Sequence, residues 1–424
     1  MAAVACLVIL AVMCFFFVTE LLPLAVTAMS GAVAVGLVGL VPLQDIFNGL
    51  SNGMVILMAG MLVVGSAMFH TGLAQRISEW VVRHVGKSEN SLMLVCMGVG
   101  AVMSSFLSNV GMTASLLPIV LGICSASKIS PRRQLMPMAF GCGLGGVITV
   151  IGTPSNLIAS GTLANAGLKG FGFFEFAWIG IPVTVAGILY MVLVGKRFLP
   201  TDGATGKGID GNAAVAAQAS TNDPRKMYAV AVICLAALVM LATGTSVVPE
   251  HVTAVIAVLL IVSGRCLTER QAFESIDWVT VFLFAGMMPV STAMDKSGAG
   301  KMIADAAVGL MGGSPSPMVV TAILFVLSCG LTQFMSNTAS AALLCPIGIS
   351  IAQQIGADPH AVLMAIAVAA SCAFATPVGT PPNTLVLGPG GYKFFDYVKA
   401  GTPLVIVSFI VSLVVIPIVW PFFP

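Results

Sequence analysis

Two polar motifs, each inside a long apolar stretch, carry the side chains of this sequence that are best suited to bind an ion. In the first motif, Ser104 and Ser108 are four residues apart and Asn109 follows. The second motif repeats this spacing with the residues Thr332, Ser336 and Asn337. Residues four apart lie on one face of a helix, and hydroxyl, amide and carbonyl oxygens are ligands for hard cations. The two motifs therefore predict at least two Na⁺ sites in equivalent positions.

Two further motifs break apolar spans with a Gly-Thr-Pro sequence, at residues 152–156 and 379–383. Proline has no amide hydrogen and clashes with the preceding helical turn, so backbone carbonyls are left free beside it. Gly152 and Gly379 allow the chain to turn or to approach an ion closely. Free carbonyls and the C-termini of half-helices suit Na⁺, whereas the N-termini of half-helices suit an anion.

Each motif taken alone also fits a structural role, since Ser and Thr hydroxyls often bond to their own helix and Gly-Pro often only kinks a span. The ordered repetition of the motifs favours the ion site. Residues 47–77 align without gaps on residues 273–303, and all four motifs fall in the same register. The offset between matched positions stays between 226 and 228 residues. The chain is therefore predicted to contain two copies of one unit.

The elements that must position these motifs are predicted to be membrane helices. Apolar residues make up 58% of the 424 residues and charged residues only 8%, against roughly 25% charged residues in soluble domains. The length allows about ten spans of ~20 residues each. Stretches 91–127 and 318–355 are too long for one span, and their Ser-Asn pairs must be buried in protein or face a wet cavity. We interpret both stretches as re-entrant helical hairpins with the Ser-Asn pair at the tip.

The predicted fold is an all-α polytopic membrane protein, with two inverted repeats of five transmembrane helices each plus two re-entrant helical hairpins. The first repeat covers residues 1–200, a polar linker follows at 201–226, and the second repeat covers 227–424. Each repeat crosses the membrane an odd number of times, so the second copy must be inverted. Inverted repeats are typical of secondary transporters, whose binding site lies at the repeat interface.

The distribution of lysine and arginine predicts the orientation, because cytoplasmic loops are enriched in both. With the N-terminus outside, only Lys169, Lys296 and Lys301 face outward, and the other 15 of the 18 basic residues lie on the opposite side. We therefore expect a multi-pass protein of the cell (inner) membrane with both termini periplasmic or extracellular and the 201–226 linker cytoplasmic. The amphipathic segments 73–85 and 299–311 are expected to lie along the membrane interface.

Ionisable side chains are nearly absent from the predicted spans, and Glu20, Asp45, Asp277 and Asp295 lie near span ends. A charge at the bilayer centre is costly unless it is compensated. An anionic substrate would then need co-bound cations, helix N-termini and Asn or Thr donors, which argues for cation-coupled symport. A proton antiporter would need a buried acid, for which Glu20 is the candidate; the alternative is that Glu20 caps the turn before Pro23.

An enzyme is not predicted. The ten cysteines are scattered without a C-x-x-C pair or a histidine cluster, which is typical of cysteines that serve as small apolar residues in helices. No nucleophile–base pair or nucleotide-binding motif is present in the sequence. No cofactor is expected beyond Na⁺ as the coupling ion, and no nucleic-acid partner is expected.

The motifs resemble those of the divalent anion:sodium symporter family, within the wider ion transporter superfamily, over nearly the whole chain. Besides the two tips and the two breaks, the segment TELLPLAVT at 19–27 carries the resemblance. The resemblance implies a homodimer in the lipid bilayer and an elevator mechanism, in which a transport domain carries both hairpins past a scaffold domain. The implied function is Na⁺-coupled symport of a divalent anion, namely a C4-dicarboxylate, citrate or sulfate.

The resemblance also implies site residues by position. The first sodium site is implied at Ser104, Ser108, Asn109, Gly152 and Asn156. The second sodium site is implied at Thr332, Ser336, Asn337, Gly379 and Asn383. The substrate is implied to contact Asn109, Val110, Thr153, Pro154, Asn337, Thr338, Thr380 and Pro381.

The sequence departs from the family pattern at the first tip, where Val110 stands in place of a threonine, whereas the second tip keeps Thr338. The lost hydroxyl donor weakens the prediction of a dicarboxylate and favours a smaller or different oxyanion such as sulfate. Many members also carry a further N-terminal helix, and the lack of one here agrees with an external N-terminus. Oxyanion (arsenite) efflux or Na⁺/H⁺ antiport is the alternative within the superfamily, and the scarcity of buried acids weighs against it.

Overall fold

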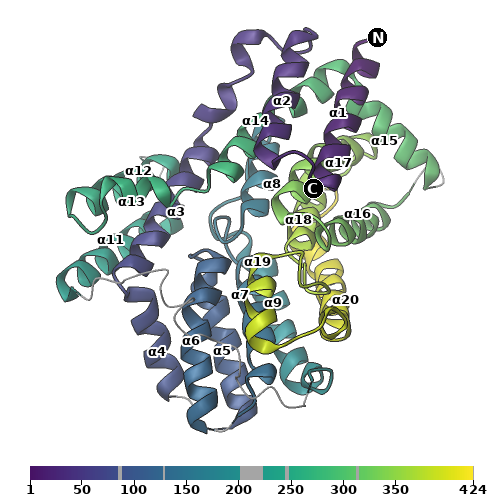
Figure 1. The fold of residues 1–424 in the computed structure, drawn as a ribbon. Coiled ribbons are helices and arrows are strands. Elements are labelled where there is room, and N and C mark those ends of the chain that lie inside the picture. The colour runs from purple at the N-terminus through teal and green to yellow at the C-terminus, as the bar shows by residue number, and fades with distance from the viewer. Residues whose placement is uncertain (85–87, 128, 201–222, 244–247, 312–314, 424) are drawn as a thin grey trace.

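The protein folds into helices joined by short loops (Figure 1), as a computed structural model of residues 1–84, 88–127, 129–200, 223–243, 248–311 and 315–423 shows. No strand occurs among these residues, so the predicted all-α class is confirmed. The expected linker lies outside the described residues up to position 222. Its last residues, 224–226, are instead the first turn of a helix that begins at Pro224.

The first half of the chain contains nine α-helices and four short 3₁₀ turns among the described residues. The α-helices are α1 (Ala2–Thr19), α2 (Leu24–Leu37), α3 (Gly53–His70), α4 (Leu73–His84), α5 (Glu89–Ser104), α6 (Asn109–Ser127), α7 (Leu135–Gly145), α8 (Pro154–Asn165) and α9 (Ala177–Leu193). The 3₁₀ turns are η1 (Leu43–Asp45), η2 (Asn48–Ser51), η3 (Pro131–Arg133) and η4 (Gly195–Arg197).

The second half repeats this order of long, amphipathic, hairpin and broken helices. Its members are α11 (Pro224–Thr243), α12 (Glu250–Ser263), α13 (Glu269–Glu274), α14 (Trp278–Ser297), α15 (Ala299–Leu310), α16 (Pro317–Thr332), α17 (Asn337–Gln354), α18 (Pro359–Ala370), α19 (Pro381–Gly390) and α20 (Phe394–Val419). Six segments among the described residues are long and apolar enough to cross a membrane: α1, residues 43–70, α6, α11, α14 and α20.

The helix α1 illustrates why these segments suit a bilayer. It buries Cys6, Leu10, Met13 and Phe17 on one side, and its other side exposes apolar residues such as Val8, which is 57% accessible. A helix that is apolar all round, with only one face covered by protein, is stable when lipid covers the other face.

Both predicted hairpins are present, and each turns at its Ser-Asn pair. The first hairpin consists of α5 and α6, which starts at Asn109, and the second consists of α16 and α17, which starts at Asn337. In Figure 1 the first hairpin lies at the bottom of the view and the second at the right, beside α18. The two ends of each turn are helix ends, which leave backbone groups without a partner inside the helix.

Both Gly-Thr-Pro motifs break a membrane segment into two half-helices, α7 and α8 in the first half and α18 and α19 in the second. The residues before the two prolines have almost the same extended backbone, with φ −145° and ψ 144° at Thr153 and φ −147° and ψ 139° at Thr380. A residue before proline is pushed out of the helical region, and proline then suits the first helical position. The sequence motif therefore fixes where each half-helix begins.

The half-helices interleave the two halves of the chain. Helix α8 packs against α17 and α18 of the second half, and α19 packs against α6 and α7 of the first half. The residues of α7, Leu135–Gly145, are all buried, as are residues 361–370 of α18. This interleaving brings both hairpin tips and both breaks to one place.

Candidate functional site

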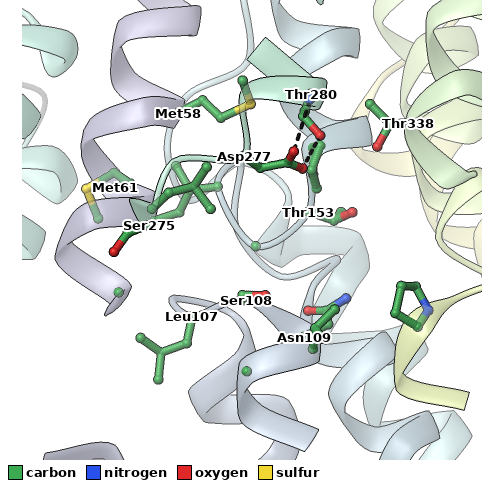
Figure 2. Close-up of a pocket in the computed structure, with 18 of the residues that line it drawn as sticks. Met58, Met61, Leu107, Ser108, Asn109, Thr153, Ser275, Asp277, Thr280 and Thr338 are labelled. Carbon is green, nitrogen blue, oxygen red and sulfur yellow. Dashed lines mark hydrogen bonds between the residues drawn. The ribbon is translucent and has the colours of Figure 1, made fainter. Parts of the chain in front are cut away.

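The two tips and the two breaks line one cavity of about 630 Å³. Figure 2 shows Ser108 and Asn109 of the first tip, Thr153 of the first break and Thr338 of the second tip around this space. All eight residues implied as substrate contacts line it: Asn109, Val110, Thr153, Pro154, Asn337, Thr338, Thr380 and Pro381. The hairpin-tip serines and the break glycines line it too, namely Ser108, Ser336, Gly152 and Gly379.

Four helices begin at this cavity: α6 at Asn109, α17 at Asn337, α8 at Pro154 and α19 at Pro381. The first turns of a helix carry the positive end of the helix dipole and unpaired amide hydrogens, except at prolines such as Pro154, Pro381 and Pro382, which have none. A helix N-terminus is therefore a ready anion site. No lysine or arginine is among the described residues that line the cavity, so the positive potential comes from the backbone.

Helices also end beside the cavity, which places carbonyl oxygens there. In the first half, α5 ends at Ser104 and α7 ends at Gly145. The Ser104 hydroxyl donates to Asn109 Oδ1 at 2.5 Å, and Ser104 is fully buried. A Cβ added at Gly146 would lie 2.8 Å from the Asn109 amide, so the end of α7 closely approaches this side chain. A hydroxyl and an amide oxygen therefore meet behind the first tip, beside Gly146 at the end of α7.

The second half repeats this arrangement, with α16 ending at Thr332 and α18 ending at Ala370. One atom of the Asn337 amide lies 2.7 Å from Thr332 Oγ1, 3.1 Å from Ala370 O and 3.3 Å from Gly379 O. The amide nitrogen in this position donates to these oxygens. The amide oxygen in the same position would leave oxygens facing one another, an arrangement that a cation stabilises.

Asn156 and Asn383 are fully buried and do not line the cavity. The Asn156 amide nitrogen donates to Gly146 O at 3.2 Å and to Thr149 O at 2.8 Å. The Asn383 nitrogen donates to the equivalent carbonyls, Ala373 O and Thr376 O, both at 2.9 Å. These two residues therefore hold the loop of each broken helix. Neither amide oxygen has a hydrogen-bond partner among the described residues, so each keeps a free acceptor.

The sequence did not predict a second pair of residues that hold the broken helices in place, Thr149 and Thr376. The Thr149 hydroxyl donates to Ser105 O, and the Thr376 hydroxyl donates to Gln333 O at 2.6 Å. Each bond ties a broken helix to the turn of the neighbouring hairpin. The signal was present, because these two threonines have the same offset as the break glycines, 227 residues.

The remaining wall of the cavity comes from α3 and from the residues around the start of α14. His70 Nδ1 lies 3.0 Å from Ser66 O, and the Ser275 hydroxyl donates to Ser66 Oγ at 2.6 Å. Asp277 accepts the Thr280 amide at 3.2 Å and also the Thr280 hydroxyl, which Figure 2 shows as dashed lines. Asp277 thus caps α14 while it faces the cavity, a place that its position near a span end did not predict.

Glu20 is not part of the cavity lining. It is an exposed residue that ends α1 in a left-handed backbone conformation, with φ 51° and ψ 23°. This position corresponds to the interfacial cap that was the alternative for Glu20. Among the described residues no group of three or more His, Cys, Asp or Glu side chains is placed to hold a metal ion, and the ten cysteines are free thiols.

Comparison with known proteins identifies the family of this chain. A family model described as citrate transporter matches residues 14–344 and 308–422. The chain belongs to the citrate transporter family. Members of this family are transporters and not enzymes, as the sequence predicted. The predicted resemblance to divalent anion:sodium symporters is confirmed at the level of the family.

Several similar proteins match nearly the whole chain. The uncharacterized transporter YfbS of Escherichia coli K12 is 26% identical, with 98% of each chain covered. An uncharacterized transporter of Haemophilus influenzae is 27% identical over 96% of this chain and 89% of its own length. The sodium-dependent dicarboxylate transporter SdcS of Staphylococcus saprophyticus is 24% identical over 95% of this chain and 83% of its own length.

Two solved structures share the fold. The YdaH transporter of Alcanivorax borkumensis superposes with a TM-score of 0.63 at 16% identity, covering 95% of this chain and 98% of its own. MtrF of Neisseria gonorrhoeae superposes with a TM-score of 0.63 at 15% identity, covering 93% of this chain and 85% of its own. The polytopic helical fold of this citrate transporter family member is thus one that other transporters share.

Proposed function

We propose that this protein is a secondary active transporter that couples the uptake of a divalent anion to Na⁺. The anion is a C4-dicarboxylate, citrate or sulfate. The single observation that supports this most is the convergence of four helix N-termini on a cavity that has oxygen clusters behind each hairpin tip. An anion fits the first feature and cations fit the second, so the two ligands neutralise each other inside the membrane.

The anion is proposed to lie between the two tips. Thr338 and Thr380 are buried hydroxyl donors at the edge of the cavity, 8% accessible each. The two Asn side chains at the tips add amide groups, and the α6, α8 and α17 termini add backbone amides, whereas α19 begins with Pro381 and Pro382 and adds only the positive end of its dipole. Val110 presents an apolar surface in place of a hydroxyl, so the substrate makes fewer hydrogen bonds at the first tip than at the second.

Sodium is proposed to bind behind each tip. At the first site the ligands are Ser104, Ser108, Asn109 and the carbonyls at the ends of α5 and α7. At the second site they are Thr332, Ser336, Asn337, Ala370 O and Gly379 O. Binding there requires the Asn337 amide to turn its oxygen toward the ion. Asn156 and Asn383 hold the loops that supply these carbonyls.

We also propose an elevator movement within a homodimer. Both hairpins pack with the broken helices, through α5 with α7, α16 with α18, α17 with α8, and α6 with α19. Together these form the moving body, while α2 with α14 and α3 with α12 form the other packed group. With the termini outside, His70 and Asp277 lie at the cytoplasmic ends of α3 and α14. The cavity then faces the cytoplasm, which corresponds to the inward-facing state.

The test is uptake of radiolabelled succinate, citrate and sulfate into proteoliposomes with an inward Na⁺ gradient. Uptake of one of these anions is expected in sodium buffer and not in choline buffer. Asn109→Ala and Asn337→Ala should abolish it. Asn90→Ala is the matched control, because Asn90 is an exposed residue at the base of the first hairpin that accepts from Lys196. Equal uptake in choline with a pH gradient would refute sodium coupling.

Proton coupling is the second candidate, within the alternative of oxyanion (arsenite) efflux or Na⁺/H⁺ antiport. The observation in its favour is that Asp277 and Glu274 line the cavity. Asp277 already caps α14 through Thr280, which is a sufficient reason for a carboxylate there. Release of protons when Na⁺ is added without any anion would support this candidate over symport.

A further inference from the structure

A chain of three hydroxyl groups links the cavity to the second oxygen cluster. Thr153 Oγ1 lies 3.2 Å from Ser155 Oγ, and Ser155 Oγ lies 3.0 Å from Ser371 Oγ. The three residues are at most 4% accessible, so water does not replace these contacts. Thr153 lines the cavity, and Ser371 directly follows Ala370, whose carbonyl accepts the Thr332 hydroxyl at 2.6 Å. These three hydroxyl groups therefore connect the cavity proposed for the anion to the second oxygen cluster, which is proposed for Na⁺.

This link joins the two halves of the protein. The equivalent positions of the repeat do not form a second link of this kind. Ser155 and Ser371 are 216 residues apart and lie on α8 and at the end of α18. The position equivalent to Ser155 is Pro382, and the position equivalent to Ser371 is Leu144. A proline and a leucine have no side-chain hydrogen-bonding groups. The equivalent helix ends therefore have no such hydroxyl chain.

The hydroxyl hydrogens of this chain have two consistent directions. Ser371 also lies 3.2 Å from Ala367 O. When Ser371 donates to this carbonyl, Ser155 donates to Ser371 and Thr153 donates to Ser155, which leaves no hydroxyl hydrogen for the cavity. When Thr153 instead donates to an anion, Ser155 donates to Thr153 and Ser371 donates to Ser155. Ala367 O then loses its hydroxyl donor.

The second direction favours a cation at the second oxygen cluster. Each hydroxyl dipole then has its positive end toward the anion and its oxygen toward the end of α18. The freed Ala367 carbonyl adds to the negative end of that helix, which ends at Ala370. A row of hydroxyl dipoles aligned in a low dielectric reinforces this effect along the row. The sign of the coupling is therefore positive, as symport requires.

We infer that Ser155 and Ser371 are positioning residues that couple the anion at Thr153 to Na⁺ at the second site. The inference rests on the proposed sodium-coupled function. Coupling between binding sites is reciprocal, so the anion must tighten the binding of Na⁺ by the same factor as Na⁺ tightens the binding of the anion. Ser155→Ala or Ser371→Ala breaks the row of hydroxyl groups at one point. The factor by which each ligand tightens the binding of the other should then fall by about three- to tenfold.

The experiment is a sodium titration of uptake at several concentrations of whichever of succinate, citrate and sulfate the wild-type protein takes up. The same titration of thermal stability of the purified protein in detergent reads binding without transport. Ser160→Ala is the matched control. Ser160 is a fully buried serine of α8 whose hydroxyl contacts Phe171 O at 3.4 Å and takes no part in the row of three hydroxyl groups. The double variant Ser155→Ala/Ser371→Ala should lose no more coupling than either single variant.

The inference holds if both single variants lose coupling, the double variant matches them and Ser160→Ala does not. It is overturned, with the proposed function intact, if wild-type uptake depends on Na⁺ and the single variants keep the wild-type factor. Additive losses in the double variant also overturn it, because two independent defects would then be present. Wild-type uptake that ignores Na⁺ overturns both the inference and the proposed function.

Discussion

Thr332→Val tests the second sodium site with little change of shape. The Thr332 hydroxyl lies 2.6 Å from Ala370 O and 2.7 Å from the Asn337 amide, and the residue is fully buried. Valine fills the same volume without the oxygen. A hydrogen bond to a charged group contributes about 1.5–3 kcal/mol, and we take the same scale for one oxygen ligand of Na⁺. The Na⁺ concentration for half-maximal uptake should therefore rise by about 10- to 150-fold.

The assay is a sodium titration of anion uptake in proteoliposomes, with thermal stability measured on the same preparations. Stability without Na⁺ should fall by about 0.5–1.5 kcal/mol, because the hydrogen bond from the Thr332 hydroxyl to Ala370 O is lost while the Asn337 amide nitrogen still donates to that carbonyl. Thr321→Val is the control: Thr321 is fully buried on the same helix, and its hydroxyl bonds to Pro317 O at 2.8 Å, far from the hairpin tip in sequence.

Thr321→Val should therefore leave the sodium dependence unchanged even if it costs some stability. Ser104→Ala should produce a comparable shift through the first site, where its hydroxyl donates to Asn109. The reasoning is refuted if Thr332→Val is folded and keeps the wild-type sodium dependence. It is equally refuted if Thr321→Val shifts that dependence as much, since the effect would then come from the helix and not from the oxygen.

Three further predictions concern the frame of the site and its selectivity. Gly152→Ala should lower the free energy of unfolding by about 1–3 kcal/mol, because its Cβ would lie 2.5 Å from Gly146 O. Gly122→Ala should not lower it, because a Cβ there would meet no neighbouring atom within 4 Å. Val110→Thr should tighten dicarboxylate binding several-fold, measured by competition of uptake, and sulfate should gain less. Arg132→Gln should lower the melting temperature, because Arg132 donates to the carbonyls of Gly390 and Gly391; an unchanged melting temperature would contradict this.

The sequence predicted much of the fold because polar residues in apolar segments leave few choices. Ser108-Asn109 and Ser336-Asn337 interrupt stretches too long for one span, and α6 and α17 begin at these asparagines. The Gly-Thr-Pro motifs likewise marked the starts of α8 and α19. In each case the backbone constraint is local, so a few residues determine where a helix ends.

Contacts between distant segments could not be predicted in this way. The prediction that Asn156 belongs to the first sodium site stays a prediction. The sequence could not show that its amide nitrogen donates to Gly146 O and Thr149 O, because the direction in which an amide turns depends on the carbonyls around it. Ser155 escaped notice because it breaks the repeat instead of following it. The sequence showed Asp277 only as a residue near the end of a span. The packing of α14 beside the hairpins is what places it at the cavity.

The four helix ends around the cavity have a consequence for how this site can change over time. Peptide groups do not ionise between acid and alkaline conditions, and any single substitution except one that introduces proline leaves their amide hydrogens in place. The attraction for an anion is therefore inherited with the fold itself, whereas the side chains at the tips, such as Val110, are free to vary. Proteins that descend from this fold can change which anion they bind through substitutions at a few tip residues. None of the intermediate forms has to lose its attraction for negative charge.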